Sequence, residues 1–141
     1  MKITKCSPAD YETLVGIWER SVRASHDFLP EDTIMEIKAA LVPAYFPAVD
    51  IYAVEDSNVF AGFIGLSGDM IEMLFIDSDC RGRGLGSELI GFARRRGALR
   101  VDVNEQNHYA LEFYKAKGFR IIGREDTDDA GRPYPILHMS L

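Results

Sequence analysis

The sequence predicts an α+β fold in which helices and strands follow the order βααβββαβαββ around one mixed sheet. Three observations support this. The chain has 141 residues, of which 47% are hydrophobic, enough for one domain (residues 1–141) with its own core. Residues 50–76 consist of short apolar runs separated by turn compositions, as in an antiparallel meander. The segments before and after it carry apolar residues at helical spacing.

The N-terminal third predicts a strand followed by two helices. Residues 2–6 form the short strand, and Ser7 with Pro8 marks the start of a helix that runs to about Ser25. A second helix follows the break at Pro30. Its apolar stripe is Ile34, Ile37, Leu41 and Tyr45, and its end is blurred by Pro43 and Pro47.

In the rest of the chain, the spacing of apolar residues alternates between that of strands and that of helices. A helix begins near Leu85 and ends at Arg94–Gly97, where cations and a glycine suit a helix C-terminus. The three meander strands and the last four elements are expected at residues 50–55, 59–66, 70–76, 99–103 (strand), 107–117 (helix), 119–125 (strand) and 134–141 (strand).

Composition and charge exclude several classes of protein. The 16 Lys and Arg against 22 Asp and Glu give a net charge of −6, which argues against nucleic acid or an anionic membrane as partner. Cys6 and Cys80 lack metal or disulfide spacing, and the three His residues have no ligand spacing, so we expect no metal site. No stretch resembles a membrane span or a signal peptide. We therefore expect a soluble, cytoplasmic protein.

The most informative segment is glycine-rich and follows an apolar strand. Closely spaced glycines at residues 82–86 lead into a helix, whose first amides and positive dipole end can hold a phosphate or pyrophosphate. A Walker A loop is excluded because no GxxxxGK[ST] is present. A dinucleotide fold is disfavoured, although Asp102 lies at a plausible distance, because Ser87 stands where its third glycine belongs. A glycine-rich turn without a ligand is the remaining alternative.

Two motifs together resemble the GNAT family of N-acetyltransferases. Arg81, Gly84 and Gly86 match the family's [Q/R]xxGxG/A signature at a strand-to-helix junction. Residues 107–119 match NxxAxxFYxxxGF. The resemblance implies a mostly antiparallel central sheet flanked by helices in three layers. It also implies direct transfer of an acetyl group from acetyl-CoA to a primary amine, of a protein lysine or a small molecule.

The resemblance also assigns the cofactor site. The strand end would hold the pantetheine and polarise the thioester carbonyl, residues 82–87 would hold the pyrophosphate, and Asn107 would contact the cofactor as well as cap its helix. Tyr114 would be the general acid, because tyrosine with its ordinary pKa of about 10 stays protonated at neutral pH. The expected cofactor-binding residues are Leu74, Phe75, Ile76, Arg81, Gly82, Arg83, Gly84, Leu85, Gly86, Ser87, Asn107 and Tyr114.

The general base and the acceptor are less defined by sequence. Glu72 is the lone charge of an apolar strand and is our preferred base, acting through water, unless it faces solvent at a sheet edge. His26 is the other candidate. Four carboxylates near the second helix could attract an amine or simply form a solvated face; they are Asp27, Glu31, Asp32 and Glu36. The different-class alternative is a non-catalytic acetyl-CoA sensor, and either a monomer or a homodimer fits.

Overall fold

The computed structural model describes residues 2–141, which divide into two compact units at Ala98. The predicted order of elements is confirmed. The first unit contains β1 (Lys2–Lys5), α1 (Tyr11–Ser25), α2 (Glu31–Ala40), β2 (Asp50–Asp56), β3 (Val59–Ser67), β4 (Met70–Ile76) and α3 (Leu85–Arg95). The second contains β5 (Arg100–Asn104), α4 (His108–Ala116), β6 (Arg120–Glu125) and β7 (Ile136–Ser140).

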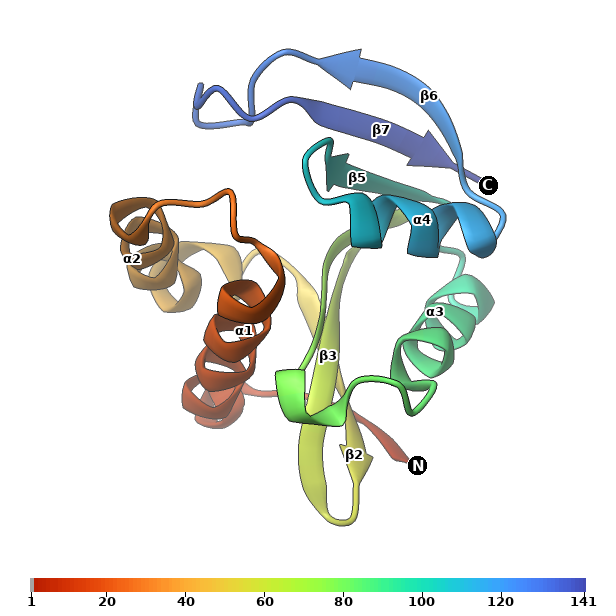
Figure 1. Cartoon of the computed structure of the whole chain (residues 1–141). Coiled ribbons are helices and arrows are strands. Elements are labelled where there is room, and N and C mark those ends of the chain that lie inside the picture. Colours follow the sequence, from red (N-terminus) through yellow and green to blue (C-terminus); the bar gives the residue numbers. More distant parts are fainter. Residues whose placement is uncertain (1) are drawn as a thin grey trace. The chain divides into compact units, whose positions relative to one another are not determined.

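The strands of the first unit form an antiparallel meander in the order β1-β2-β3-β4 (Figure 1). Ala53, Phe63 and Phe75 lie opposite one another on β2, β3 and β4. Because side chains alternate between the faces of a sheet, Tyr52, Ile64 and Leu74 form the matching row on the other face. The first unit thus has two apolar faces to cover.

Helices cover both faces, so the first unit has three layers. On one side, Leu14 and Trp18 of α1 belong to the same buried cluster as Ala53 and Phe63. On the other side, Tyr52 contacts Phe92 of α3, with ring centroids 4.8 Å apart. Figure 1 shows α1 and α3 on opposite sides of β3. The three-layer prediction is confirmed for this unit.

The end of the second helix differs from the sequence prediction. After α2 the chain forms a π-turn (Leu41–Tyr45), in which the amide of Phe46 donates to the carbonyl of Leu41 over 2.8 Å. The wider turn changes the helical phase, so Tyr45 is exposed and Phe46 is fully buried. The apolar stripe predicted to include Tyr45 was therefore wrong at that residue, and Pro43, which has no amide hydrogen, lies inside the turn.

Two register shifts interrupt the meander. Between β3 and β4, Ile71 and Met73 pair with adjacent residues of β3 and Glu72 lies in the bulge between them, and between β2 and β3 the same happens at Ala61. Gly62, paired with Ile76, allows a close approach: a Cβ there would lie 2.9 Å from the carbonyl oxygen of Phe75. The end of β4 is thus pressed tightly against β3.

The strands of the second unit have the order β5-β7-β6, all antiparallel. Val101 and Val103 of β5, with Leu137 and Met139 of β7, are buried. Helix α4 packs against β5. A register shift in β6 leaves Ile122 unpaired and exposed. Within residues 2–141, no helix is long and apolar enough to cross a membrane.

Candidate functional site

The β4–α3 loop (residues 77–84) has the geometry expected of an anion cradle. Gly82 and Gly84 both have positive φ angles, 78° and 76°, which a residue with a side chain adopts only under strain. Gly84 is the N-cap of α3, so the amides that follow it open the helix. The side chain of Leu85 is buried, and only its backbone remains for a ligand. The loop therefore presents backbone at the positive end of a helix dipole.

Asp77 fixes the point where β4 enters this loop. Its amide donates to the carbonyl of Ala61 over 2.8 Å, and its own carbonyl accepts from the amide of Cys80 over 2.8 Å. Arg20 of α1 donates to both oxygens of the buried carboxylate, through Nε (3.0 and 3.2 Å) and Nη2 (2.8 Å). This pairing holds the pKa of Asp77 below its usual range, so the carboxylate is charged at neutral pH.

The two loop arginines contact other parts of the first unit. Arg81 donates through Nη2 to the carbonyl oxygen and to Oγ of Ser21, over 3.2 and 3.3 Å. Arg83 forms an ion pair with Asp56, at 3.1 Å. The sequence predicted both arginines as cofactor contacts. Their side chains have protein partners here, so the backbone of the loop is the better candidate for contact with an anion.

The strand end that was expected to hold the pantetheine is half-buried. Leu74, Phe75 and Ile76 are all partly accessible, and Phe75 packs between Trp18 and Phe63 with centroid distances of 6.5 and 5.7 Å. The core thus anchors this strand through Phe75, while its backbone continues directly into Asp77.

The second unit carries the other predicted motif. Oδ1 of Asn107 accepts from the amide of Ala110 over 3.1 Å, so the predicted helix cap is confirmed. Tyr114 is buried against Phe113 and Phe119, with centroids 5.3 and 5.5 Å away. Burial raises the pKa of Tyr114, so the phenol keeps its proton at neutral pH. The residue is at once a core aromatic and a protonated donor.

The structure separates the two candidate bases. Glu72 lies in the β4 bulge and its side chain is exposed, so the interpretation as a buried carboxylate is wrong. His26 follows the end of α1, and its Nδ1 lies 2.9 Å from Oγ of Ser25. Burial, helped by the charge of Arg81, lowers the pKa of His26 to about 4. His26 is therefore neutral at pH 7.

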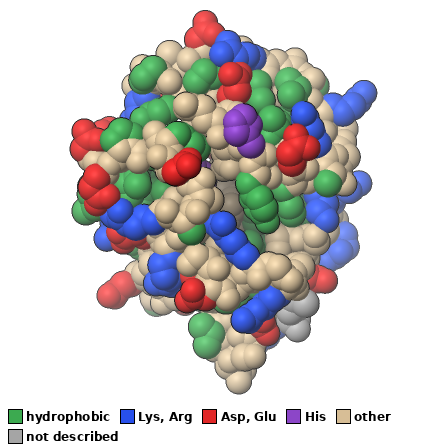
Figure 2. Space-filling view, in the orientation of Figure 1, with side chains coloured by type: hydrophobic (Ala, Val, Ile, Leu, Met, Phe, Trp, Pro, Cys, Tyr) green, Lys and Arg blue, Asp and Glu red, His purple; other side chains and the backbone are tan. Residues whose placement is uncertain are grey.

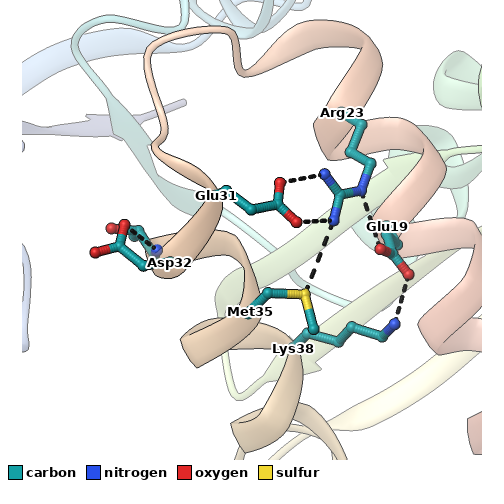
Figure 3. Close-up of polar contacts among 7 residues, drawn as sticks. Glu19, Arg23, Glu31, Asp32, Met35 and Lys38 are labelled. Carbon is teal, nitrogen blue, oxygen red and sulfur yellow. Dashed lines mark hydrogen bonds and ion pairs between the residues drawn. The ribbon is translucent and has the colours of Figure 1, made fainter.

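The acidic residues of α2 form a paired surface rather than an open acidic one. Figure 3 shows Arg23 between Glu31 and Glu19, with Lys38 on the far side of Glu19. Arg23 donates to both oxygens of Glu31 (2.6 and 2.8 Å) and to Glu19 (3.0 Å), and Lys38 pairs with Glu19 at 2.7 Å. Asp32 accepts from the amide of Thr33. This favours the interpretation as a solvated helix face.

Charges of both signs are mixed on the surface that Figure 2 shows. Lys and Arg side chains lie among Asp and Glu side chains there, with no broad patch of one sign. The local pairs explain this, since Arg20, Arg23 and Arg83 each have a carboxylate partner. The charges on this face are therefore balanced locally and are not divided into a cationic and an anionic region.

Sequence reasoning missed the residues that brace the loop. Arg20 and Asp77 are 57 residues apart, and Arg81 and Ser21 are 60 apart, with no motif that links them. The one available signal was a charged residue directly after an apolar strand, at Asp77. Among residues 2–141, no group of three His, Cys, Asp or Glu side chains is placed to hold a metal ion.

The fold and the loop define a protein of the acyl-CoA-dependent acyltransferase class. Residues 36–136 match the family described as acetyltransferase (GNAT) domain. The chain is 42% identical over 130 residues to the peptidyl-lysine N-acetyltransferase YjaB of Salmonella typhimurium, covering 91% of this chain and 89% of that protein.

Solved structures agree. The apo-form solution structure of YjaB from Escherichia coli has a TM-score of 0.90 at 39% identity, covering 99% of this chain and 95% of that one. The Thermoplasma acidophilum PaiA N-acetyltransferase in complex with coenzyme A has a TM-score of 0.74 at 20% identity and covers 99% and 98%. It shares the fold. The chain belongs to the GNAT acetyltransferase family.

Proposed function

We propose that this protein transfers the acetyl group of acetyl-CoA to lysine side chains of other proteins. Acetyl transfer itself follows from membership of the family. The choice of acceptor rests on one observation, the 42% identity over most of both chains to a relative named as a peptidyl-lysine N-acetyltransferase. The sensor alternative is not favoured, because that relative is named as an enzyme.

The reaction sets three chemical demands. The lysine must lose a proton so that its nitrogen lone pair can attack the thioester carbonyl, the oxyanion must be stabilised, and the departing CoA thiolate must gain a proton. We assign pyrophosphate binding to the backbone of residues 82–87. The backbone at Phe75 and Ile76 would hold the pantetheine and polarise the carbonyl.

Tyr114 is proposed as the general acid. Support comes from its place in the NxxAxxFYxxxGF motif and from burial, which keeps the phenol protonated at neutral pH. The phenol would give its proton to the CoA sulfur as the carbon–sulfur bond breaks. Asn107 is proposed as a cofactor contact in addition to its cap.

Glu72 is proposed as the base, reached by the ammonium proton through water. Its exposure on the β4 bulge supports a solvent path, whereas burial disfavours the charged form that His26 would acquire as a base. We expect Glu72→Gln to change the pH dependence of kcat/KM. An unmoved profile would remove Glu72 from the mechanism and leave His26, to be tested as His26→Gln.

The acceptor is tested by CoA release. The substrates are a peptide with a blocked N-terminus and one lysine, the same peptide with arginine in place of lysine, and a panel of free amino acids and polyamines. We expect release only with the lysine peptide, and mass spectrometry should place the acetyl group on its side chain. A higher kcat/KM for a small amine would refute the protein-lysine proposal, and tight acetyl-CoA binding without release on any amine would favour the sensor.

We also propose that residues 1–141 act as one acetyltransferase domain. The match to the family spans residues 36–136 and so crosses the boundary between the two units. A reducing, cytoplasmic location is proposed as well, since Cys6 and Cys80 are both free thiols.

A further inference from the structure

A single site on α1 holds both ends of the short turn that begins the β4–α3 loop. The turn is the 3₁₀ helix Ser78–Cys80. Before it, Asp77 accepts the two-pronged contact of Arg20, and after it, Arg81 donates to Ser21, the residue next to Arg20. Both Asp77 and Ser21 are buried. The turn is therefore fixed from outside the loop, by neighbouring residues of one helix.

The glycines of the part of the loop that follows have no side chains to hold them in place. Gly82 and Gly84 have left-handed backbones, and an added Cβ at either residue would meet no atom within 4 Å. Glycine has more backbone freedom than any other residue, so these positions are costly to order. Beyond them, α3 is anchored by the buried Leu85 and Leu89. The position of the loop amides thus depends on α3 at one end, on the α1 contacts at the other, and on the half-exposed Arg83–Asp56 ion pair between them.

Asp77 uses all its polar groups at this junction. Its amide and carbonyl bond to Ala61 and Cys80, and both oxygens of its carboxylate accept from Arg20. An asparagine there would keep the size of the side chain but lose the charge and one acceptor oxygen. A lysine in place of Arg20 would keep the charge but lose the two-pronged geometry.

We propose that Arg20 and Asp77 are positioning residues for acetyl-CoA, which hold the loop amides in their pyrophosphate-binding arrangement before the cofactor arrives. The inference rests on the proposed assignment of residues 82–87 to the pyrophosphate. A loop that is already ordered loses less conformational entropy when the cofactor binds. The Arg20–Asp77 pair should therefore change the affinity for acetyl-CoA and not the rate of the chemical step. Neither side chain needs to touch the substrate.

The experiment compares two acetyl donors. Acetyl-CoA carries the pyrophosphate, and S-acetylpantetheine carries the same thioester without it. For Asp77→Asn we expect acetyl-CoA to bind about tenfold more weakly by calorimetry, with kcat within about twofold of wild type. The kcat/KM for S-acetylpantetheine should stay unchanged. Arg20→Lys should show a smaller loss, and the double variant Arg20→Lys/Asp77→Asn should be no worse than Asp77→Asn alone.

A matched control exists in the second unit. Asp128 also accepts from an arginine, Arg132 Nη1 at 3.1 Å, and from two backbone amides, those of Ala130 and Arg132. Asp128→Asn should therefore also weaken a carboxylate–arginine pair, while its acetyl-CoA affinity remains that of wild type. Thermal melts of all variants measure the loss of stability separately.

The outcomes separate the two proposals. If wild-type enzyme uses S-acetylpantetheine as well as acetyl-CoA, the pyrophosphate assignment itself fails. The positioning role is refuted if wild type prefers acetyl-CoA but Asp77→Asn and Arg20→Lys bind it normally. It is also refuted if these variants lose kcat/KM equally with both acetyl donors. If the losses of acetyl-CoA affinity add up in the double variant, the proposal that Arg20 and Asp77 act as a pair is likewise refuted. Should Asp77→Asn fail to fold, Arg20→Lys, which keeps the charge, decides the question by the same criteria.

Discussion

The two motif-bearing segments of this protein are held in place in opposite ways. The β4–α3 loop of the first unit is braced by partners 57 and 60 residues away, Arg20 on Asp77 and Ser21 on Arg81. The segment that begins at Asn107 is held by near neighbours: Asn107 caps the amide three residues on, and Tyr114 packs against Phe113 and Phe119. A loop of glycines needs external support, whereas a capped helix supplies its own.

This contrast suggests a division of labour that experiments can break. Under the proposed mechanism, the first unit sets affinity for acetyl-CoA and the second supplies the proton. Variants of the loop and its braces should then change binding, and variants of Tyr114 should change turnover.

Tyr114→Phe should lower kcat roughly 10²-fold or more, because the change removes the hydroxyl group that would donate the proton and leaves the aromatic ring in place. Acetyl-CoA affinity, measured by calorimetry, should change little. Tyr109→Phe on the same helix is the control, since that side chain is 67% exposed, and its kcat should be that of wild type. Unchanged turnover in Tyr114→Phe would refute the proposal that the second unit supplies the proton.

Gly62→Ala should destabilise the first unit by about 1–3 kcal/mol, as overpacking does. The new Cβ would lie 2.6 Å from Cδ1 of Ile76, which can rotate, but also 2.9 Å from the carbonyl oxygen of Phe75, which cannot. The midpoint of urea unfolding measures the loss.

Gly91→Ala in α3 is the matched control for Gly62→Ala. Its Cβ would approach only the flexible guanidinium of Arg95, at 3.4 Å, so the better helix propensity of alanine should stabilise the protein by about 0.5–1 kcal/mol. Equal effects of the two substitutions would show that β3 and β4 are not tightly apposed at the loop.

His138 provides the smallest effect, a pH dependence in the second unit. Hydrogen bonds and charge from Asp102, 2.7 Å away, and then from Glu125 raise the pKa of His138 above its ordinary value. The stability this adds is complete below the unfolded pKa of about 6.5 and is lost as pH rises through the folded pKa. The difference in Tm between wild type and His138→Gln should therefore be larger near pH 5.5 than near pH 8.5. The opposite order would mean that the carboxylates do not hold the charged imidazole.

Much of the fold was predictable because local sequence patterns determine its elements. The meander follows from apolar runs between turn residues, α3 from its glycine start, and the cap at Asn107 from residue type and spacing. The prediction failed at the end of the second helix, where Tyr45 was expected on the buried face and Phe46 lies there instead. Nothing in the sequence marks the π-turn before Phe46, because Pro43 indicates that the helix is disturbed but not which way the chain then turns.

The candidate site was predictable in its glycines and not in its braces. Left-handed Gly82 and Gly84 follow from a motif whose residues are neighbours in the chain. The Arg20–Asp77 pair depends on how α1 packs on the sheet, which no local pattern encodes. For the same reason Arg81, assigned to the cofactor by motif, is found to contact Ser21, and Glu72, the odd charge of its strand, lies exposed on a bulge.

The π-turn at Leu41–Tyr45 also bears on how this part of the chain can change in length. Such a turn holds one residue more than an α-helical turn, because its hydrogen bond spans five residues instead of four. Removing Ala44 would place Phe46 four residues after Leu41, the spacing at which an ordinary α-helical turn keeps two side chains on one face. The fully buried ring would then keep its side of the helix and its place against Tyr11 and Phe63. The link between α2 and β2 is therefore a place where the chain can lose one residue while the buried aromatic contact is kept.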